Sequence, residues 1–98
     1  MTIEIKTNAE ATTIEVAGRL DATTAPMLEK TINGDIGDAT HLILDIKGVS
    51  YISSAGLRVI LSAQKKMQKI GSMKVRNVCV EVMEIFEMTG FADILVIE

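Results

Sequence analysis

The 98-residue chain is poor in aromatic residues, with two Phe, one Tyr and no Trp. It therefore lacks the aromatic platform on which many proteins stack unpaired bases. Its formal net charge of −3 is also of the wrong sign for a surface that holds phosphate backbones. Both features argue against a nucleic-acid partner.

Cysteine and histidine are equally scarce, with Cys79 and His41 the single examples of each. One cysteine cannot form an internal disulfide, and one Cys with one His does not make a metal-ligand set. The sequence also has no glycine-rich phosphate loop. We therefore expect no metal and no cofactor, and we interpret Cys79 as a small buried hydrophobic residue near the start of the last helix.

Long hydrophobic runs are missing as well. No apolar segment approaches the roughly 20 residues that span a bilayer, and the N-terminal MTIEIK lacks the basic and apolar regions of a secretion signal. These absences predict a cytoplasmic protein with no direct membrane insertion. What the chain does have is a hydrophobic content of 48%, enough to bury the core of one domain over residues 1–98.

Apolar and polar residues alternate near positions 3–5 and 14–16, which predicts two strands joined by a hairpin. Pro26 suits the first turn of a helix, because its missing N–H would be unpaired there, and this helix is predicted to reach about Ile32. The short apolar run His41–Ile46 then predicts a strand buried on both faces. The first half of the chain therefore reads strand, strand, helix, strand.

The second half alternates helices with strands. Its predicted elements are a helix from Leu57 to Ile70, a strand from Met73 to Arg76, a helix from Val82 to Thr89 ended by Gly90, and a last strand from Ile94 to Ile97. Such alternation implies parallel pairing through right-handed crossovers, which place the three main helices on one face if successive strands are neighbours. We therefore predict an α/β fold, a single-domain mixed β-sheet with an antiparallel N-terminal strand. Leu57 and Ile46 are predicted core residues.

Two hydroxyl groups, on Ser53 and Ser54, stand where the central strand gives way to the long helix. The start of a helix has unpaired N–H groups and the positive end of the helix dipole, so a phosphate on a serine is tolerated there. The simpler interpretation is that such a serine only caps the helix. The local pattern leaves both interpretations open.

Three segments together resemble the STAS domain family, which includes anti-sigma factor antagonists and the cytoplasmic tails of sulfate transporters. They are the S-S-A-G-L-R stretch from Ser53 to Arg58 with its apolar helix, the Gly18-Arg19-Leu20-Asp21 element, and the segment from Val82 to Phe91. The resemblance spans almost the whole chain, with the segments in the family's order. It also implies the mixed sheet and one-sided helices predicted above.

The resemblance also implies a site. Aligned on Gly56 and Leu57, the phosphoacceptor position of the family is Ser54, and Asp21 is its acidic neighbour on the partner-binding surface. Ser53 stands where the phosphorylated antagonists usually have Asp, which makes it a candidate second acceptor. The predicted partner-binding residues are Asp21, Ser53, Ser54, Gly56 and Arg58.

Catalysis is not expected. His41 begins the central strand and Ser54 lies beyond its far end, so five residues at roughly 3.3 Å each leave about 17 Å between them, which prevents a triad with Asp45. The residues two before Ser53 and Ser54 are not glycine, so the G-x-S-x-G elbow is absent. We predict a protein that is not an enzyme and has no catalytic residues.

Residues Lys65, Lys66 and Lys69 form a basic stripe on the long helix. We favour a solvated helix face over a partner's footprint for this stripe.

The resemblance implies an anti-sigma factor antagonist. When unphosphorylated, it would bind an anti-sigma factor that is also a serine kinase; phosphorylation at Ser54 would release it, and a serine phosphatase would reset it. Transcription would be regulated indirectly. The alternative is a non-switching STAS structural subunit of a membrane transport or signalling assembly, in which Ser54 is only a cap. A small-molecule sensor has little support, because the sequence shows no convergent polar pocket.

Overall fold

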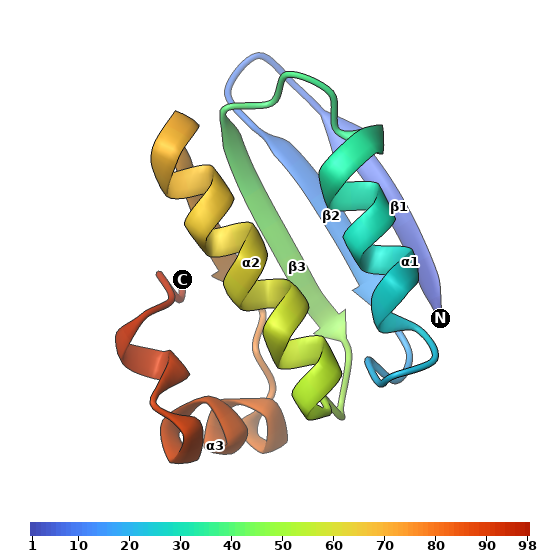
Figure 1. The fold of residues 1–98 in the computed structure, drawn as a ribbon, viewed down its shortest axis with the longest axis vertical. Helices are drawn as coiled ribbons and strands as arrows, with labels where there is room; N and C mark the ends of the chain where they lie inside the picture. Colours follow the sequence, from blue (N-terminus) through green and yellow to red (C-terminus); the bar gives the residue numbers. More distant parts are fainter.

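A computed structural model describes residues 1–98 as one sheet with helices packed against it (Figure 1). The sheet has the order β1-β2-β3-β4, in which β1 and β2 are antiparallel while β2, β3 and β4 are parallel. This arrangement confirms the predicted mixed sheet with an antiparallel N-terminal strand. The strands are β1 (Thr2–Thr7), β2 (Thr12–Ala17), β3 (His41–Gly48) and β4 (Ser72–Arg76).

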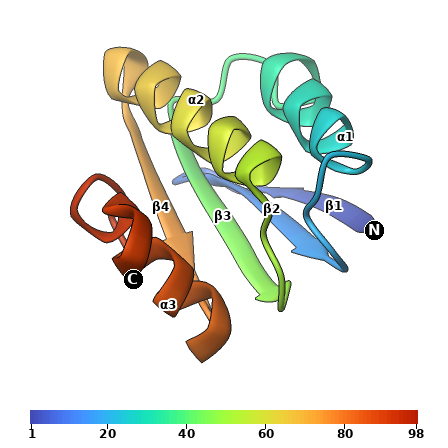
Figure 2. The ribbon, with the colours of Figure 1, turned by 60° about the horizontal axis from the view of Figure 1, so that its bottom comes forward.

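The helices are α1 (Ala25–Lys30), which continues as the π-helical turn η1 (Thr31–Asp35), then α2 (Ser54–Ile70), α3 (Val80–Thr89) and the short 3₁₀ turn η2 (Phe91–Asp93). Helices α1 and α2 lie side by side over one face of the sheet, while α3 lies past the end of β4 (Figure 2). The predicted placement of the helices mainly on one face is confirmed, and the same core includes the buried Val82 and Phe86 of α3. The link from β4 to α3 is only residues 77–79, and Asn77 turns the chain in the left-handed region at φ 60°, so α3 begins at the end of the sheet.

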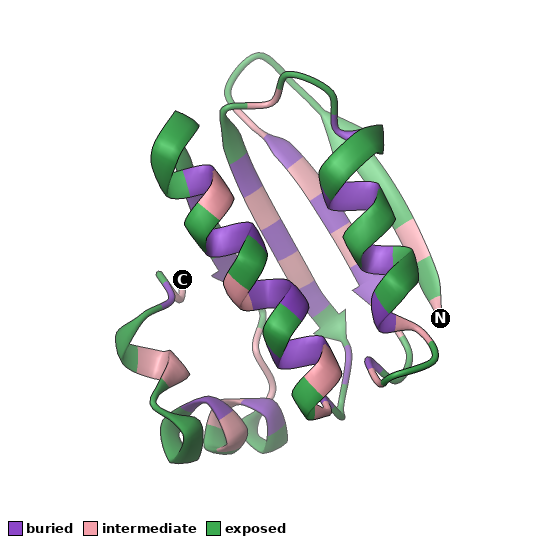
Figure 3. Ribbon diagram, viewed as in Figure 1, coloured by how far each residue is buried: buried purple, intermediate pink, exposed green.

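Buried residues alternate with half-buried ones along β2 and most of β3 (Figure 3). On the helix side, Ile14, Leu44 and Val75 are aligned across three strands and are each 0% exposed. On the other side, Glu15 is aligned with Asp45 and Asp45 with Arg76. Each fully buried aliphatic side chain contributes about 1.5–3 kcal/mol. The core therefore lies between the sheet and the helices, and the opposite face carries charge.

The residues around the predicted serine loop belong to this core. Ile46, near the end of β3, is 0% exposed, and Leu57, in the first turn of α2, is 8% exposed. Both predictions of core placement are confirmed. The loop between β3 and α2 is thus held at both ends by buried side chains.

The C-terminus differs from the predicted strand at Ile94–Ile97. Gly90 ends α3 in the left-handed region at φ 82°, and η2 then takes the chain through a further turn. The chain reaches β4 only at its last residues, where the Val75 N–H donates to the Val96 carbonyl at 2.8 Å and the Glu98 N–H donates to the Val75 carbonyl at 2.8 Å. Val75 and Ile97 form a single parallel bridge, because the Ile94 and Leu95 N–H groups instead donate to the Phe91 carbonyl, at 3.0 Å and 2.9 Å.

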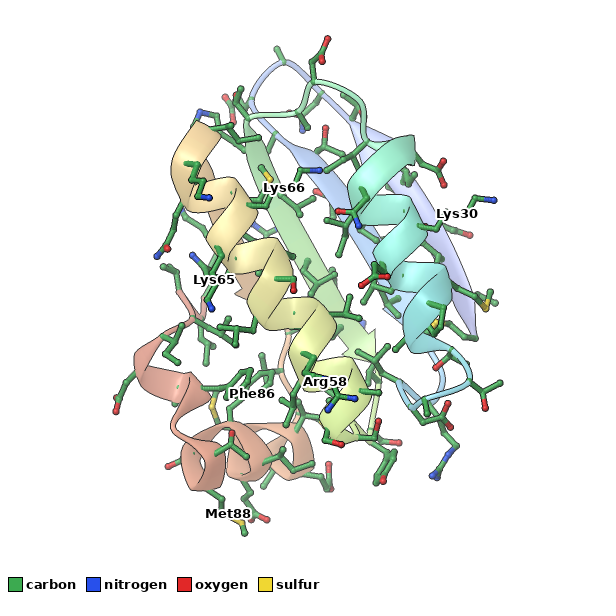
Figure 4. All side chains as sticks on the ribbon, viewed as in Figure 1. Lys30, Arg58, Lys65, Lys66, Phe86 and Met88 are labelled. Atoms are coloured by element: carbon green, nitrogen blue, oxygen red, sulfur yellow. The ribbon has the colours of Figure 1, made fainter.

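Helix one extends further than its predicted end near Ile32, because η1 carries it on to Asp35. The widened turn leaves the Ile32 carbonyl free for Lys66, whose Nζ donates to it at 2.9 Å (Figure 4). Lys66 therefore ties α2 to α1 instead of belonging to a purely solvated stripe. Lys69 remains exposed on the same helix.

Cys79 is half-buried and stands at the N-cap position of α3. Its thiol donates a weak hydrogen bond to the Val49 carbonyl, with 3.4 Å between the sulfur and the oxygen. The residue is near the start of the last helix, as predicted, but it is a partly exposed contact and not a fully buried hydrophobic residue.

Candidate functional site

Two loops meet at the edge of the sheet where β2 and β3 end. The Leu20 N–H donates to the Tyr51 carbonyl at 3.1 Å, and the Ser53 N–H donates to the Leu20 carbonyl at 2.9 Å. Leu20 and Ile52 form a parallel bridge between the same loops. The carboxyl ends of parallel strands share one edge of a sheet, which is where ligands of α/β proteins commonly bind. The topology thus brings the Asp21 loop alongside the serine pair.

The two serines have different places in the structure. Ser53 is the N-cap of α2, with φ −89° and ψ 174°, and its Oγ accepts a long hydrogen bond of 3.5 Å from the Gly56 N–H. Its carbonyl accepts the Leu57 N–H at 2.9 Å. Ser54 is the first residue of the helix and is exposed, whereas Ser53 is half-buried. The cap and the accessible hydroxyl are therefore separate residues.

The N-terminus of α2 is electrostatically open to an anion. The first N–H groups of a helix have no partner within the helix, and the helix dipole places its positive end there. The first turn of α2 contains no acidic residue that would offset this charge. A negative group added at Ser54 would therefore meet favourable helix dipoles.

Asp21 is held by its own loop. Its Oδ1 accepts the N–H groups of Thr23 at 3.0 Å and Thr24 at 3.2 Å. The hydrogen bond from the Thr24 N–H is the main cause that lowers the pKa of the Asp21 carboxyl below its usual range. The carboxylate therefore stays ionised at neutral pH, and its local role is that of a turn residue before α1. A negative charge is fixed beside the serine loop.

Gly56 allows the two loops to meet. A Cβ at this position would lie 2.7 Å from Leu20 Cγ, 2.9 Å from the Leu20 carbonyl oxygen and 3.1 Å from Ile52 Cγ2. The residue is buried, so it offers no surface to a partner. Its place in the site is to let α2 approach the Leu20 loop.

Arg58 lies one turn after Ser54 on α2 and is exposed. Residues four apart on a helix share a face, so the guanidinium and the Ser54 hydroxyl lie on the same side of α2. Arg58 also borders a groove of about 330 Å³ between α1 and α2 (Figure 4). The groove is lined by Ala22, Ala25, Pro26, Glu29, Ala55, Arg58, Val59 and Ser62.

Two further residues join the site that the sequence did not single out. The Arg19 guanidinium carbon lies 4.2 Å above the centre of the Tyr51 ring, and Arg19 Nε lies 3.5 Å from Asp21 Oδ2. Arg19 is two residues before Asp21, and Tyr51 is two before Ser53. Their spacing puts each residue near the site, but the sequence carries no local signal of the contact between them.

The residues of the rejected triad are not brought together. His41 starts β3, and its Nδ1 lies 2.8 Å from Ser72 Oγ at the opposite end of the strand from Ser54. No three His, Cys, Asp or Glu side chains gather where they could hold a metal ion. None of the helices combines the length and the apolar composition needed to cross a bilayer.

The sequence and the fold match one known family. The family model described as "STAS domain" matches residues 2–98. The chain belongs to the STAS domain family, which confirms the resemblance drawn from the sequence. A curated relative, the anti-sigma-B factor antagonist of Bacillus subtilis strain 168, is 30% identical over 94 residues that cover 95% of this chain and 86% of the relative.

Solved structures agree in fold. An anti-sigma factor antagonist from Mycobacterium paratuberculosis superposes with a TM-score of 0.88 at 23% identity, over 98% of this chain and 83% of that chain. The Bacillus cell fate determinant SpoIIAA, solved in its phosphorylated form, superposes with a TM-score of 0.76 at 18% identity, over 99% of this chain and 91% of that chain. At these identities the likeness concerns the fold.

Proposed function

We propose that this protein is an anti-sigma factor antagonist that acts in the cytoplasm and is switched by phosphorylation at Ser54. In its unphosphorylated form it binds an anti-sigma factor that is also an ATP-dependent serine kinase, and the sigma factor is freed. The Ser54 oxygen attacks the terminal phosphorus of ATP, the bond from that phosphorus to the β-phosphate oxygen breaks, ADP leaves, and the hydroxyl proton is lost to solvent. A serine phosphatase hydrolyses the phosphoester and restores the binding form.

The proposal rests chiefly on the placement of Ser54 as the exposed first residue of α2, beside the loop of Asp21. It draws further support from the relatives, since the curated protein that is 30% identical is itself named an anti-sigma-B factor antagonist. The same placement favours Ser54 over Ser53 as the acceptor. The Ser53 hydroxyl is half-buried and already accepts a backbone N–H, so phosphorylation there would disturb the cap.

Phosphorylation would change the charge of this surface without unfolding the protein. A phosphate adds about −1.5 to −2 charge and three acceptor oxygens, and the dipole of α2 tolerates it. The new charge is added to a site whose other loop carries the ionised Asp21. A kinase surface that fits a neutral hydroxyl would then face concentrated negative charge and an extra desolvation cost, so affinity falls.

The surface available to the kinase follows from the same geometry. It comprises the exposed Ser54, the fixed carboxylate of Asp21, and Arg58 on the rim of the α1–α2 groove. Gly56 and Ser53 support this surface indirectly, because Gly56 lets α2 approach the Leu20 loop and Ser53 caps α2. Opposite charges stand close together on this surface, which favours a partner with a matching pattern of charge.

Phosphate mapping tests the modification itself. The protein is purified from its own host, its intact mass is measured, and any phosphopeptide is sequenced. We expect a fraction heavier by one phosphate that maps to Ser54, and no such fraction in a Ser54→Ala strain. Protein that carries no phosphate at Ser54 under growth, stress and stationary conditions would instead favour the non-switching structural subunit.

Calorimetric titration tests the binding. The kinase is the one that copurifies with tagged Ser54→Ala protein and that phosphorylates wild type with Mg²⁺ and ATP. We expect wild type and Ser54→Ala to bind it with similar affinity and Ser54→Asp to bind at least about tenfold more weakly. Ser53→Ala is the matched control, and it should bind and be phosphorylated. Equal affinity for wild type and both Ser54 variants would refute the switch.

A further inference from the structure

Strand β1 forms an open edge of the sheet. It pairs only with β2, whereas the far edge at β4 is bridged by the C-terminal residues through Val75 and Ile97. Five of the six residues of β1 are exposed, and Ile3 is half-buried (Figure 3). The outer backbone groups of such a strand are free to pair with another chain, and natural proteins commonly shield them.

We propose that a second copy of this chain pairs with β1, antiparallel and with a two-fold axis through Ile5, so that the two sheets form one continuous sheet. The occupant is a second copy because the charges of β1 are complementary to themselves in this register. Glu4 of one copy lies opposite Lys6 of the other, and the symmetry repeats the pair. Ile5 lies opposite Ile5.

Two-fold symmetry limits the registers in which two copies of β1 can pair. In an antiparallel pair, residues directly opposite each other point to the same face, and a two-fold axis normal to the sheet keeps each residue's face unchanged. The axis must therefore pass through a residue and not between two residues. A register centred on Glu4 or on Lys6 would set that charge opposite itself. Only centring on Ile5 opposes Glu4 and Lys6.

The charges within one copy leave Glu4 in need of a cation. Glu4 lies directly opposite Glu15 on β2, and like charges so placed are destabilising. Glu15 is paired with Lys6 at 3.0 Å, while Glu4 makes no ion pair. In the dimer, each Lys6 would lie between its own Glu15 and Glu4 of the second copy. Negative and positive side chains would then alternate across the joined strands, in place of the two adjacent glutamates.

The helix side of β1 gains apolar contact in the same register. Ile5 is 40% exposed, although its neighbour on β2, Ile14, is fully buried. Pairing Ile5 with its own copy would continue the apolar row of the core across the axis. The contact is confined to one short strand, which is below the roughly 1,200 Å² of standard interfaces. The expected product is a weak, reversible dimer that high salt weakens further.

Sedimentation velocity over a concentration series up to about 1 mM measures the dimer, a range suited to weak association. We expect concentration-dependent dimerisation of wild type at low salt. Lys6→Glu opposes Glu4 with Glu, and Glu4→Lys opposes Lys6 with Lys, so each should raise the dimer Kd at least about tenfold. Lys74→Glu is the matched control, because it makes the same charge change at an exposed position on β4 and should leave the Kd unchanged.

Mixing the two edge variants makes the test specific. In a Glu4→Lys and Lys6→Glu heterodimer, both cross-strand pairs again join opposite charges, so the mixture should dimerise although neither variant does alone. Native mass spectrometry distinguishes the heterodimer by mass. Circular dichroism establishes that both variants are folded. A wild type that stays monomeric throughout the series, or a mixture that gains no dimer, overturns the proposal.

Discussion

The Ser53 N–H donates to the carbonyl of Leu20 at 2.9 Å, and this backbone bond connects the two loops of the candidate site. The return bond, from the Leu20 N–H to Tyr51, completes a short parallel bridge. Because backbone groups hold the loops together, side-chain changes at Asp21 or Ser54 leave this connection in place. A loss of binding in such variants then reports the surface.

The division between cap and acceptor predicts different stabilities for two neighbouring alanine variants. Ser53→Ala removes the N-cap oxygen and should lower the free energy of unfolding by about 0.5–1 kcal/mol, at the low end of cap effects because the bond is long. Ser54→Ala removes an exposed hydroxyl at N1 and should change it by less than about 0.5 kcal/mol. Urea denaturation of both variants measures the difference. An equal loss in the two would contradict the assignment of Ser53 as the cap.

The close approach at Gly56 predicts that a single methyl group is costly there. Gly56→Ala would place Cβ against Leu20, including its carbonyl oxygen at 2.9 Å, and should destabilise the fold by about 1–3 kcal/mol. Gly34→Ala is the matched control, because a Cβ at Gly34 meets nothing within 4 Å. It should be neutral or slightly stabilising. Thermal melts should therefore show a lower melting temperature for Gly56→Ala than for Gly34→Ala. Equal melting temperatures would show that the two loops separate easily to make room for the methyl group.

The buried position of Leu57 predicts a larger loss. Leu57→Ala should lower the free energy of unfolding by about 2–5 kcal/mol, through lost transfer energy and the cavity that remains. Met88→Ala, at a side chain that is 86% exposed on α3, should stay within about 0.5 kcal/mol of wild type. Chemical denaturation compares them. A loss at Leu57 no greater than that at Met88 would mean that Leu57 is not part of the core.

The sequence predicted the sheet, its pairing and the helix that follows the serines, because those segments have clear apolar periods and well-defined turns. It could not predict the end of the chain. Ile94–Ile97 has the composition of a strand, but the Ile94 and Leu95 N–H groups donate to the Phe91 carbonyl of the preceding turn, and only Ile97 forms a bridge to β4. The residue composition of this segment does not predict the path of the chain through that turn.

The sequence proposed the residues of the candidate site but did not distinguish the structural positions of the two serines. Both serines suit a helix start, and only the backbone dihedral angles identify Ser53 as the cap. Arg19 was overlooked because its contact with Tyr51 joins two loops that are distant in sequence. Pairwise contacts of this kind depend on the loop register, which local patterns do not specify.

The lowered pKa of Asp21 predicts a pH dependence that Asp21→Asn should lack. Hydrogen bonds from the Thr24 and Thr23 N–H groups favour the ionised carboxyl in the folded state. The ionised Asp21 carboxyl therefore stabilises the fold fully above the ordinary Asp pKa of about 3.9. This stabilisation is lost as the pH falls through the lower pKa that the carboxyl has in the folded protein. Thermal melts between about pH 2 and pH 7 should show the gap between wild type and Asp21→Asn closing at the acid end. If the difference in melting temperature between wild type and Asp21→Asn persists unchanged to low pH, the destabilisation comes from the Asn side chain and not from the lost negative charge.

The position of Ser54 at the first residue of α2 predicts that Ser54→Asp separates stability from binding. The carboxylate meets the positive end of the helix dipole in a first turn without acidic residues, so the free energy of unfolding should stay unchanged or rise by about 0.3–1 kcal/mol. Binding to the kinase should fall, because the same charge is added to a proposed docking surface that already carries the ionised Asp21.

Two controls keep these effects apart. Ser54→Asn is similar in size to Ser54→Asp but uncharged, so it should retain more affinity if charge decides the outcome. Asp21→Asn, alone and combined with Ser54→Asp, completes a double-mutant cycle that measures how strongly the two positions are coupled in kinase binding, since both belong to the proposed docking surface. Urea denaturation and calorimetric titration follow the two quantities. A Ser54→Asp protein that unfolds would show that the hydroxyl site is sterically closed and would remove the physical basis of the switch.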